Sequence, residues 1–200
     1  MEERTAAFRL ITGPEGLREA ARALAGARRV GLDIEATGLS PLDARMRLLQ
    51  LAAGGETFVV DVFEVKDLSP LREALEGGPL KVLHNAKYDY SFLLAQHGIR
   101  LSPLFDTMLA AQLLDGGEQG PSYSLEAVAG RYLQETVDKT VRREDWSKEL
   151  SREQLEYAAR DAAILLPLHE RLQELLEREG LGPVSRIEFG AVPAIAEMEL

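Results

Sequence analysis

A chain of 200 residues with 46% hydrophobic residues is long enough for one domain with a real core, and its net charge of −10 is the opposite of what passive nucleic-acid binders carry. The absence of cysteine excludes disulfides, thiolate metal sites and cysteine nucleophiles, and it fits a cytoplasmic protein. Residues 1–12 contain acids and no long apolar run, and no stretch reaches the roughly 18 apolar residues of a membrane span, so we expect neither a signal peptide nor a membrane protein.

The first third of the chain predicts an edge strand, a helix and three further strands. The helix begins at Thr12-Gly13-Pro14-Glu15, where Thr12 is a candidate cap before a proline and an acid, and it ends at Gly26. The last three strands should form a meander, with a Gly-Gly turn between the final two. The strands are expected at Phe8–Ile11, within Arg28–Leu39, at Arg47–Ala52 and at Thr57–Val60.

The rest of the chain alternates a short strand with helices. Strands followed by strand–helix alternation indicate an α/β fold with a mixed sheet. A short buried strand is expected at Lys81–Leu83, and the chain returns through Ile99–Phe105. The helices are expected from Ser69-Pro70 to Gly77-Gly78, at Asn85–Gly98, at Asp106–Leu114, from Ser124 to about Leu133, from Ser151 to about Glu179 and at Val184–Leu200, with irregular segments at Asp115–Ser122, Gln134–Lys148 and Gly180–Pro183.

The helix that begins at Ser151 carries the strongest start signal in the chain. Ser151 and Gln154 form a capping box, and Leu150 and Leu155 are placed as a hydrophobic staple. Pro167 should kink or interrupt this helix, because proline removes an internal hydrogen bond.

Two carboxylates end the central strand. Val30, Leu32 and Ile34 alternate with Gly31, Asp33 and Glu35, so the apolar set enters a core while the two acids project from the opposite face, about 7 Å apart. Charges this close disfavour each other's ionisation, and a divalent cation would remove the conflict. A strand end that reaches solvent explains the same pattern, and these residues alone do not decide between the two.

Two further pairs of polar residues lie at helical spacing. Asn85 is a natural N-cap, and Asp89 lies on the same side of that helix. Tyr157 and Asp161 share one helical face at the edge of an apolar stripe. An ordinary cap with a surface acid, and a half-buried tyrosine with a solvated aspartate, are the structural alternatives. For Asp106 we expect capping or bracing of the core to be the larger role.

The three pairs together resemble a known superfamily. Asp33-x-Glu35, Asn85-x-x-x-Asp89 and Tyr157-x-x-x-Asp161 occur in the order and approximate separations of the three exonuclease motifs of the DEDD superfamily, and the tyrosine marks its tyrosine-type branch. About residues 5–178 resemble the 3′-5′ exonuclease domain of family A DNA polymerases, and also ribonuclease D. Phe105-Asp106-Thr107-Met108 and Asp138-Lys139…Asp145-Trp146 resemble further stretches of the family.

The resemblance implies a ribonuclease-H-like fold, with a mixed sheet of about five strands flanked by helices. It also implies hydrolysis with two divalent metal ions, Mg²⁺ or Mn²⁺. By matching position, Asp33, Glu35 and Asp161 would bind one ion, and Asp33 would share the second with Asp89, directly or through water. Tyr157 and Glu35 would orient the attacking water.

Substrate contacts are expected beside these acids. The resemblance places Thr37-Gly38-Leu39 at the last nucleotide, with Leu39 between the terminal bases, although a simple turn explains the same residues. Asn85 and Lys87 are further substrate-binding candidates, and for His84 we expect packing beside Asn85. Trp146 is expected to pack rather than to stack on a base. Arg45, Lys139, Arg142 and Arg143 are candidates for phosphate contacts, each with the alternative of a solvated surface charge.

The expected function is a proofreading-type 3′-5′ exonuclease that shortens single-stranded DNA and releases nucleoside monophosphates. Residues 1–183 would form the exonuclease domain, and 184–200 resemble the junction to a polymerase domain. The chain, expected to be a monomer, would be either part of such a polymerase, with a polymerase domain or subunit as its partner, or a free-standing exonuclease descended from one. The alternatives are a ribonuclease D-like exoribonuclease and a non-catalytic domain that braces a polymerase. Eighteen arginines against 5 lysines and a single asparagine are typical of thermophiles and would suit a thermophile's phage, although a GC-rich genome produces part of this bias.

Overall fold

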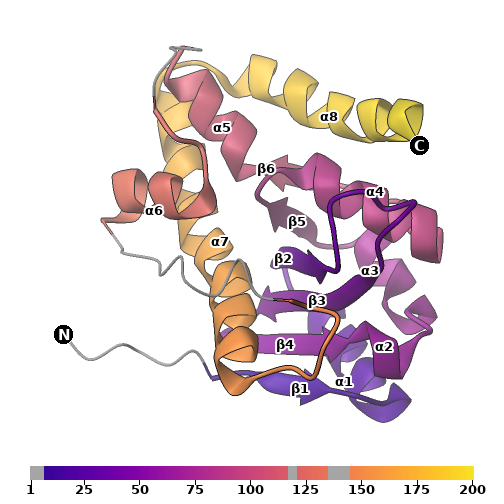
Figure 1. The fold of residues 1–200 in the computed structure, drawn as a ribbon. Coiled ribbons are helices and arrows are strands. Elements are labelled where there is room, and N and C mark those ends of the chain that lie inside the picture. Colours follow the sequence, from indigo (N-terminus) through magenta and orange to yellow (C-terminus); the bar gives the residue numbers. More distant parts are fainter. Residues whose placement is uncertain (1–6, 117–120, 135–144) are drawn as a thin grey trace.

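The computed structural model describes residues 7–116, 121–134 and 145–200, which contain a mixed six-stranded sheet flanked by helices (Figure 1). The strand order is β1-β4-β3-β2-β5-β6, with β2, β3 and β4 antiparallel as the predicted meander and the outer pairs parallel. The strands are β1 (Arg9–Ile11), β2 (Arg29–Ala36), β3 (Met46–Ala53), β4 (Glu56–Asp61), β5 (Leu80–Leu83) and β6 (Leu104–Asp106). The α/β prediction is confirmed, and the strand beyond the expected five is β6, in the returning segment.

The helices form a layer on each side of the sheet (Figure 1). No helix within the three described ranges is both long enough and apolar enough to cross a membrane. The helices are α1 (Pro14–Ala25), α2 (Val62–Val65), a 3₁₀ turn at Ser69–Leu71, α3 (Arg72–Glu76), α4 (Ala86–His97), α5 (Thr107–Leu114), α6 (Leu125–Leu133), α7 (Arg152–Arg178) and α8 (Gly182–Glu199).

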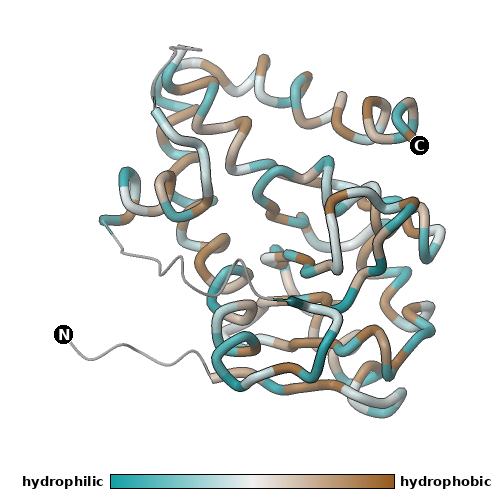
Figure 2. The backbone as a smooth tube through the Cα atoms, in the orientation of Figure 1, coloured by the Kyte–Doolittle hydropathy of each residue, from teal (hydrophilic) through white to brown (hydrophobic). Residues whose placement is uncertain are grey.

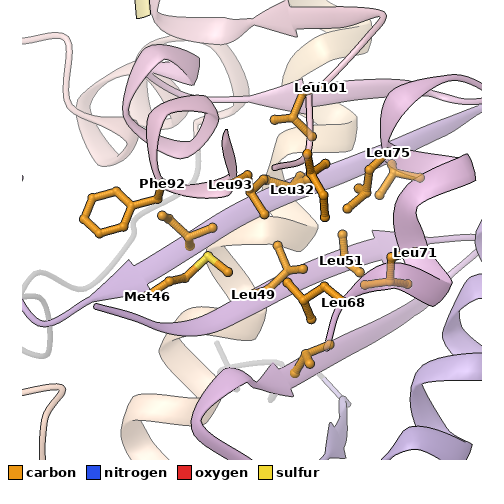
Figure 3. Close-up of a cluster of buried hydrophobic side chains, with 14 of the residues drawn as sticks. Leu32, Met46, Leu49, Leu51, Leu68, Leu71, Leu75, Phe92, Leu93 and Leu101 are labelled. Carbon is orange, nitrogen blue, oxygen red and sulfur yellow. The ribbon is translucent and has the colours of Figure 1, made fainter. Parts of the chain in front are cut away.

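One face of β2 lies in the main core. Val30, Leu32 and Ile34 alternate along the strand and are buried, as the period of two predicts. They pack with side chains of β3, α1, α3 and α4, and Figure 3 shows Leu32 among leucines of β3 and α4. Hydrophobic residues, coloured brown, recur along the strands of the sheet (Figure 2). This packing fixes which face of β2 remains for its acids.

The opposite face of β2 lies against α7 at very short range. A Cβ atom added to Gly31 would lie 2.2 Å from the carbonyl oxygen of Ala162, so only glycine fits this contact. Small residues of α7, Ala158 and Ala159, pack in the same layer with Leu48 of β3. The close approach of β2 to α7 places Asp33 and Glu35 beside Asp161 of α7.

Helix α7 is continuous through Pro167, so the predicted interruption is wrong. Proline removes one hydrogen bond, but buried leucines on both sides, Leu165, Leu168 and Leu172, hold the helix against the sheet and α5. The predicted capping box is confirmed, because Ser151 accepts from the Gln154 N–H and Gln154 accepts from the Ser151 N–H. At α1 the predicted cap is wrong, since Gly13 occupies that position and no side chain caps the helix.

Candidate active site

Three carboxylates meet where β2 ends beside α7. Asp33 and Glu35, both half-buried, project from β2 toward Asp161, which is buried on α7. One oxygen from each of the three lies within 4.8 Å of the other two. They line a cavity of about 400 Å³. Carboxylate oxygens gathered at this spacing are the ligand set that hard divalent cations prefer.

Asp89 approaches the same cavity from α4. It is 1% exposed, so the interpretation of this residue as a surface acid is wrong. Burial raises the pKa of the Asp89 carboxyl well above its usual range, the charges of Asp33 and Asp106 raise it further, and the Ile34 backbone opposes the shift. Within the described residues its Oδ1 has no hydrogen-bond partner. A buried acid with an unmatched oxygen beside three other acids fits a cation site.

Tyr157 completes the group one helical turn before Asp161. The side chain is buried and lines the cavity. Burial raises the pKa of the phenol far above its usual value, and the charges of Asp161, Glu35 and Asp33 act in the same direction. The phenol therefore keeps its proton, its O–H donates to the Asp161 carboxylate, and its oxygen remains an acceptor at the cavity wall.

The turn after β2 forms another wall of the cavity. Thr37, Gly38 and Leu39 all line it, and Leu39 is 87% exposed. The Tyr88 hydroxyl donates to the Gly38 carbonyl at 3.0 Å, which ties this turn to α4. Sequence reasoning missed Tyr88 although it lies between Asn85 and Asp89. The turn is thus held in place while Leu39 stays open to a ligand.

Asn85 lies at the cavity, but its predicted capping role is wrong. It occupies the N-cap position of α4 in a left-handed conformation, with φ of 62°, and its side chain makes no capping bond. Asp106 instead accepts from the backbone N–H groups of Asn85 and Ala86, at 3.1 and 2.8 Å. The predicted bracing role of Asp106 is confirmed, and the Asn85 side chain is left to face the cavity mouth.

Some predicted contacts lie elsewhere. Lys87 does not line the cavity, and its Nζ is bonded to Glu199 of α8 at 2.8 Å. His84 lines the cavity and is held by Thr107 Oγ1 and by the Tyr123 carbonyl. Trp146 also lines the cavity and is 5% exposed. Its packing with β3, β4 and α7 agrees with the predicted packing role.

Two acids at the cavity wall were not predicted as site residues. Glu126, in the first turn of α6, and Asp145 both line the cavity. Asp145 lies in a stretch that carried the family resemblance, whereas nothing in the local sequence marks Glu126. The candidates Lys139, Arg142 and Arg143, and Asp138 of the same stretch, lie outside the described residues.

The comparisons with known proteins agree on one family. Residues 8–177 match the family model described as 3′-5′ exonuclease. DNA polymerase I of Aquifex aeolicus is 36% identical, over 96% of this chain and 35% of that protein. Ribonuclease D of Haemophilus influenzae is 33% identical, over 86% of this chain and 43% of that protein. The chain therefore spans less than half of the length of these relatives.

Solved structures share the fold. The crystal structure of Escherichia coli RNase D, an exoribonuclease involved in structured RNA processing, superposes with a TM-score of 0.87 at 26% identity, over 95% of this chain and 50% of that chain. Brucella melitensis NrnC bound to pGG superposes with a TM-score of 0.83 at 25% identity, over 96% and 94%. The predicted resemblance is confirmed, and the chain belongs to the 3′-5′ exonuclease family.

Proposed function

We propose that this chain hydrolyses single-stranded DNA from the 3′ end and releases nucleoside monophosphates, with two divalent ions, Mg²⁺ or Mn²⁺. The observation that carries the proposal is the gathering of Asp33, Glu35 and Asp161 within 4.8 Å, with buried Asp89 lining the same cavity. Two divalent cations nearly cancel the charge of four carboxylates, which explains how so many acids share one site.

The ligands divide between the two ions by position. Asp33, Glu35 and Asp161 would hold one, and Asp33 and Asp89 would hold the second. When bound, the ions supply charge stabilisation for the entering and leaving oxygens of the phosphodiester. Asp89 supports this division, because its buried Oδ1 has no other partner within the described residues.

Tyr157 and Glu35 are proposed to orient the attacking water. The phenol keeps its proton because burial and the neighbouring acids raise its pKa. While its O–H donates to Asp161, its oxygen can accept a hydrogen bond from a water molecule, without adding a negative charge to a site that already holds four acids. Glu35 has a second carboxylate oxygen that can accept a proton from the same water.

The turn at Thr37-Gly38-Leu39 is proposed to receive the 3′ end. Leu39 is 87% exposed at the cavity, where a large apolar side chain can insert between two bases. Backbone N–H groups of the turn, with Asn85 across the cavity, would bond the terminal sugar. Because these contacts would be made only to the terminal nucleotide, they would restrict cleavage to the 3′ end of the strand.

We propose DNA as the substrate and proofreading as the role, beside a polymerase domain or subunit. The alignment with DNA polymerase I is the support, since it covers 96% of this chain against 86% for ribonuclease D of Haemophilus influenzae. RNA is the second candidate, because ribonucleases D are the more numerous relatives.

The test uses matched single-stranded DNA and RNA, each labelled at the 5′ end, with Mg²⁺, Mn²⁺ or EDTA. We expect a ladder that shortens from the 3′ end, faster for DNA, and no cleavage in EDTA. Faster loss of RNA would support the exoribonuclease. Cleavage that persists in EDTA would contradict the metal mechanism, and no cleavage of either strand would leave the non-catalytic bracing role.

A further inference from the structure

Arg45 is fixed beside the turn that forms one wall of the cavity. The Thr37 N–H donates to the Arg45 carbonyl at 2.9 Å, and the Arg45 N–H donates to Thr37 Oγ1 at 3.0 Å. Thr37 itself lines the cavity, together with the next two residues of the turn. Arg45 is therefore tied by two bonds to the wall that would meet the 3′ end of a strand.

The guanidinium of Arg45 lies over an aromatic ring. Its Cζ lies 4.3 Å from the ring centroid of Phe63 in α2, and the Cζ of Arg47 lies 4.5 Å from the same centroid. Stacking restrains a guanidinium while the N–H groups at its edge stay free to bond a ligand. Phe63 thus holds Arg45 in position before any substrate arrives.

The two stacked arginines differ in their charge partners. Arg47 is buried, and it forms an ion pair with Asp61, which also accepts from the Phe63 N–H. Arg45 is exposed, and in the described part of the chain it has no carboxylate partner. The charge of Arg47 is therefore neutralised by Asp61, whereas the charge of Arg45 is available to a ligand.

The strand pairing places this arginine along the side of the cavity. Glu35 lies opposite Leu48, and Leu48 lies opposite Asp61, so α2 begins at the same edge of the sheet where β2 ends. Arg45 therefore lies next to the acidic cavity but does not line it.

A single strand must bring further phosphates toward a chain of net charge −10. Metal ions neutralise the cavity itself, but the phosphates on the 5′ side need cations of the protein. A guanidinium matches phosphate with two parallel N–H bonds. Lys87 is less suited, because it is bonded to Glu199.

We propose that Arg45 binds the backbone phosphate of a nucleotide on the 5′ side of the scissile bond, and so favours strands with such a phosphate over those that lack one. The inference rests on the proposed exonuclease function and adds the substrate class: a strand of several nucleotides rather than a dinucleotide.

The experiment compares Arg45→Ala with the wild-type protein on two substrates, a ten-nucleotide strand and a dinucleotide without a 5′ phosphate, whose only phosphate is the scissile one. For Arg45→Ala we expect the ratio of kcat/KM on the strand to kcat/KM on the dinucleotide to fall about tenfold, because KM for the strand rises. The slope of strand affinity against salt concentration should also decrease, by the amount that corresponds to about one phosphate contact. Arg45→Lys and Phe63→Leu should each lower the ratio less, since one keeps the charge and the other keeps the guanidinium.

Arg9→Ala is the control for loss of an exposed arginine over a ring, because the Cζ of Arg9 lies 5.6 Å from the Phe58 centroid, away from the cavity, and its charge is paired with Glu19. Its ratio should equal that of the wild-type protein. An unchanged ratio in Arg45→Ala, or equal loss on both substrates, would overturn the inference while the exonuclease function stands. If the wild-type protein cleaves nothing, the proposed function fails separately, and binding of a labelled strand in Ca²⁺ still tests Arg45.

Discussion

Two buried aspartates on neighbouring elements show opposite ways of burying a carboxylate. Asp106, at the end of β6, is 2% exposed and accepts four backbone N–H bonds, two at the start of α4 and two in the first turn of α5. Asp89, on α4, is 1% exposed, and within the described residues its Oδ1 accepts none. The fold supplies donors to both oxygens of the first carboxylate, whereas one oxygen of the second has none.

A buried acid is recognised as a candidate functional group by the donors that surround its oxygens. Burial alone does not distinguish the two residues, because both are almost completely inaccessible. What distinguishes them is whether the chain supplies donors to both carboxylate oxygens, since a buried oxygen without a donor is costly and persists where a ligand supplies the missing contact. Substitutions at these two aspartates and at nearby buried residues test this distinction.

Asp161→Ala should lower the exonuclease rate by several orders of magnitude, because it removes a proposed metal ligand, one oxygen of which lies within 4.8 Å of oxygens of Asp33 and Glu35. The fold should survive, since the variant also relieves repulsion among acids. Rates on a labelled single strand and urea unfolding in EDTA measure the two effects. Asp33→Ala should behave in the same way, and near-normal rates in both variants would overturn the site assignment.

Asp106→Ala should lower the free energy of unfolding by about 2–4 kcal/mol, because backbone N–H groups at the start of two helices lose their acceptor. Asp106→Asn keeps one acceptor oxygen and should lose less. Urea unfolding measures both. A loss below about 1 kcal/mol in Asp106→Ala would mean that water replaces this carboxylate, and the comparison with Asp89 would fail.

Asp89→Asn tests the unmatched carboxylate through pH. The pKa of Asp89 is raised in the folded protein, so above the ordinary value of about 4 the folded state holds a proton that the unfolded state releases. Without metal, stability should therefore fall as pH rises from that value through the raised pKa, by at most about 1.4 kcal/mol per pH unit.

Asparagine does not titrate, so this slope should be absent from Asp89→Asn in EDTA. Mg²⁺ should restore the stability of the wild-type protein at higher pH and have less effect on the variant. Thermal unfolding across pH, with and without Mg²⁺, provides the measurement. If stability fell equally with pH in the wild-type protein and in Asp89→Asn, the titration of Asp89 would not contribute to stability, and the expectation would be wrong.

The same comparison extends to two buried glutamines. Gln50, opposite Asp33 on β3, is 0% exposed, and within the described ranges neither polar atom of its side chain has a hydrogen-bond partner. Gln50→Met should raise the free energy of unfolding by about 1 kcal/mol, because it removes buried polar atoms at similar volume. Gln154→Met is the control and should be destabilising, since Gln154 belongs to the capping box. A loss of stability in Gln50→Met would contradict the expectation.

Local patterns predicted the parts of the fold that local physics determines. The alternation along β2 and the capping box at Ser151 depend on residues within a few positions of one another, and both are confirmed. The four carboxylates were found for a different reason, because the family resemblance linked motifs that spacing alone left ambiguous. The structure then brought Asp33, Glu35 and Asp161 together.

The missed features depend on residues far apart in the chain. The start of α4 is bonded by Asp106, which lies 21 positions beyond Asn85. Lys87 is bonded to Glu199, 112 positions away. Pro167 does not end its helix because tertiary packing on both sides outweighs one lost hydrogen bond. Such contacts leave no signal in a window of neighbouring residues.

The contact between Gly31 and Ala162 has a consequence for which changes this chain can tolerate. No side chain, even a methyl group, fits between the strand and the helix there, so backbone rather than side-chain packing sets the spacing of the carboxylates on β2 and α7. Substitutions elsewhere can then alter which strands are bound without altering that spacing. The cavity walls at 37–39 and 145–146 are outside this contact. Substitutions in those walls can change the shape of the cavity while the carboxylates keep their spacing.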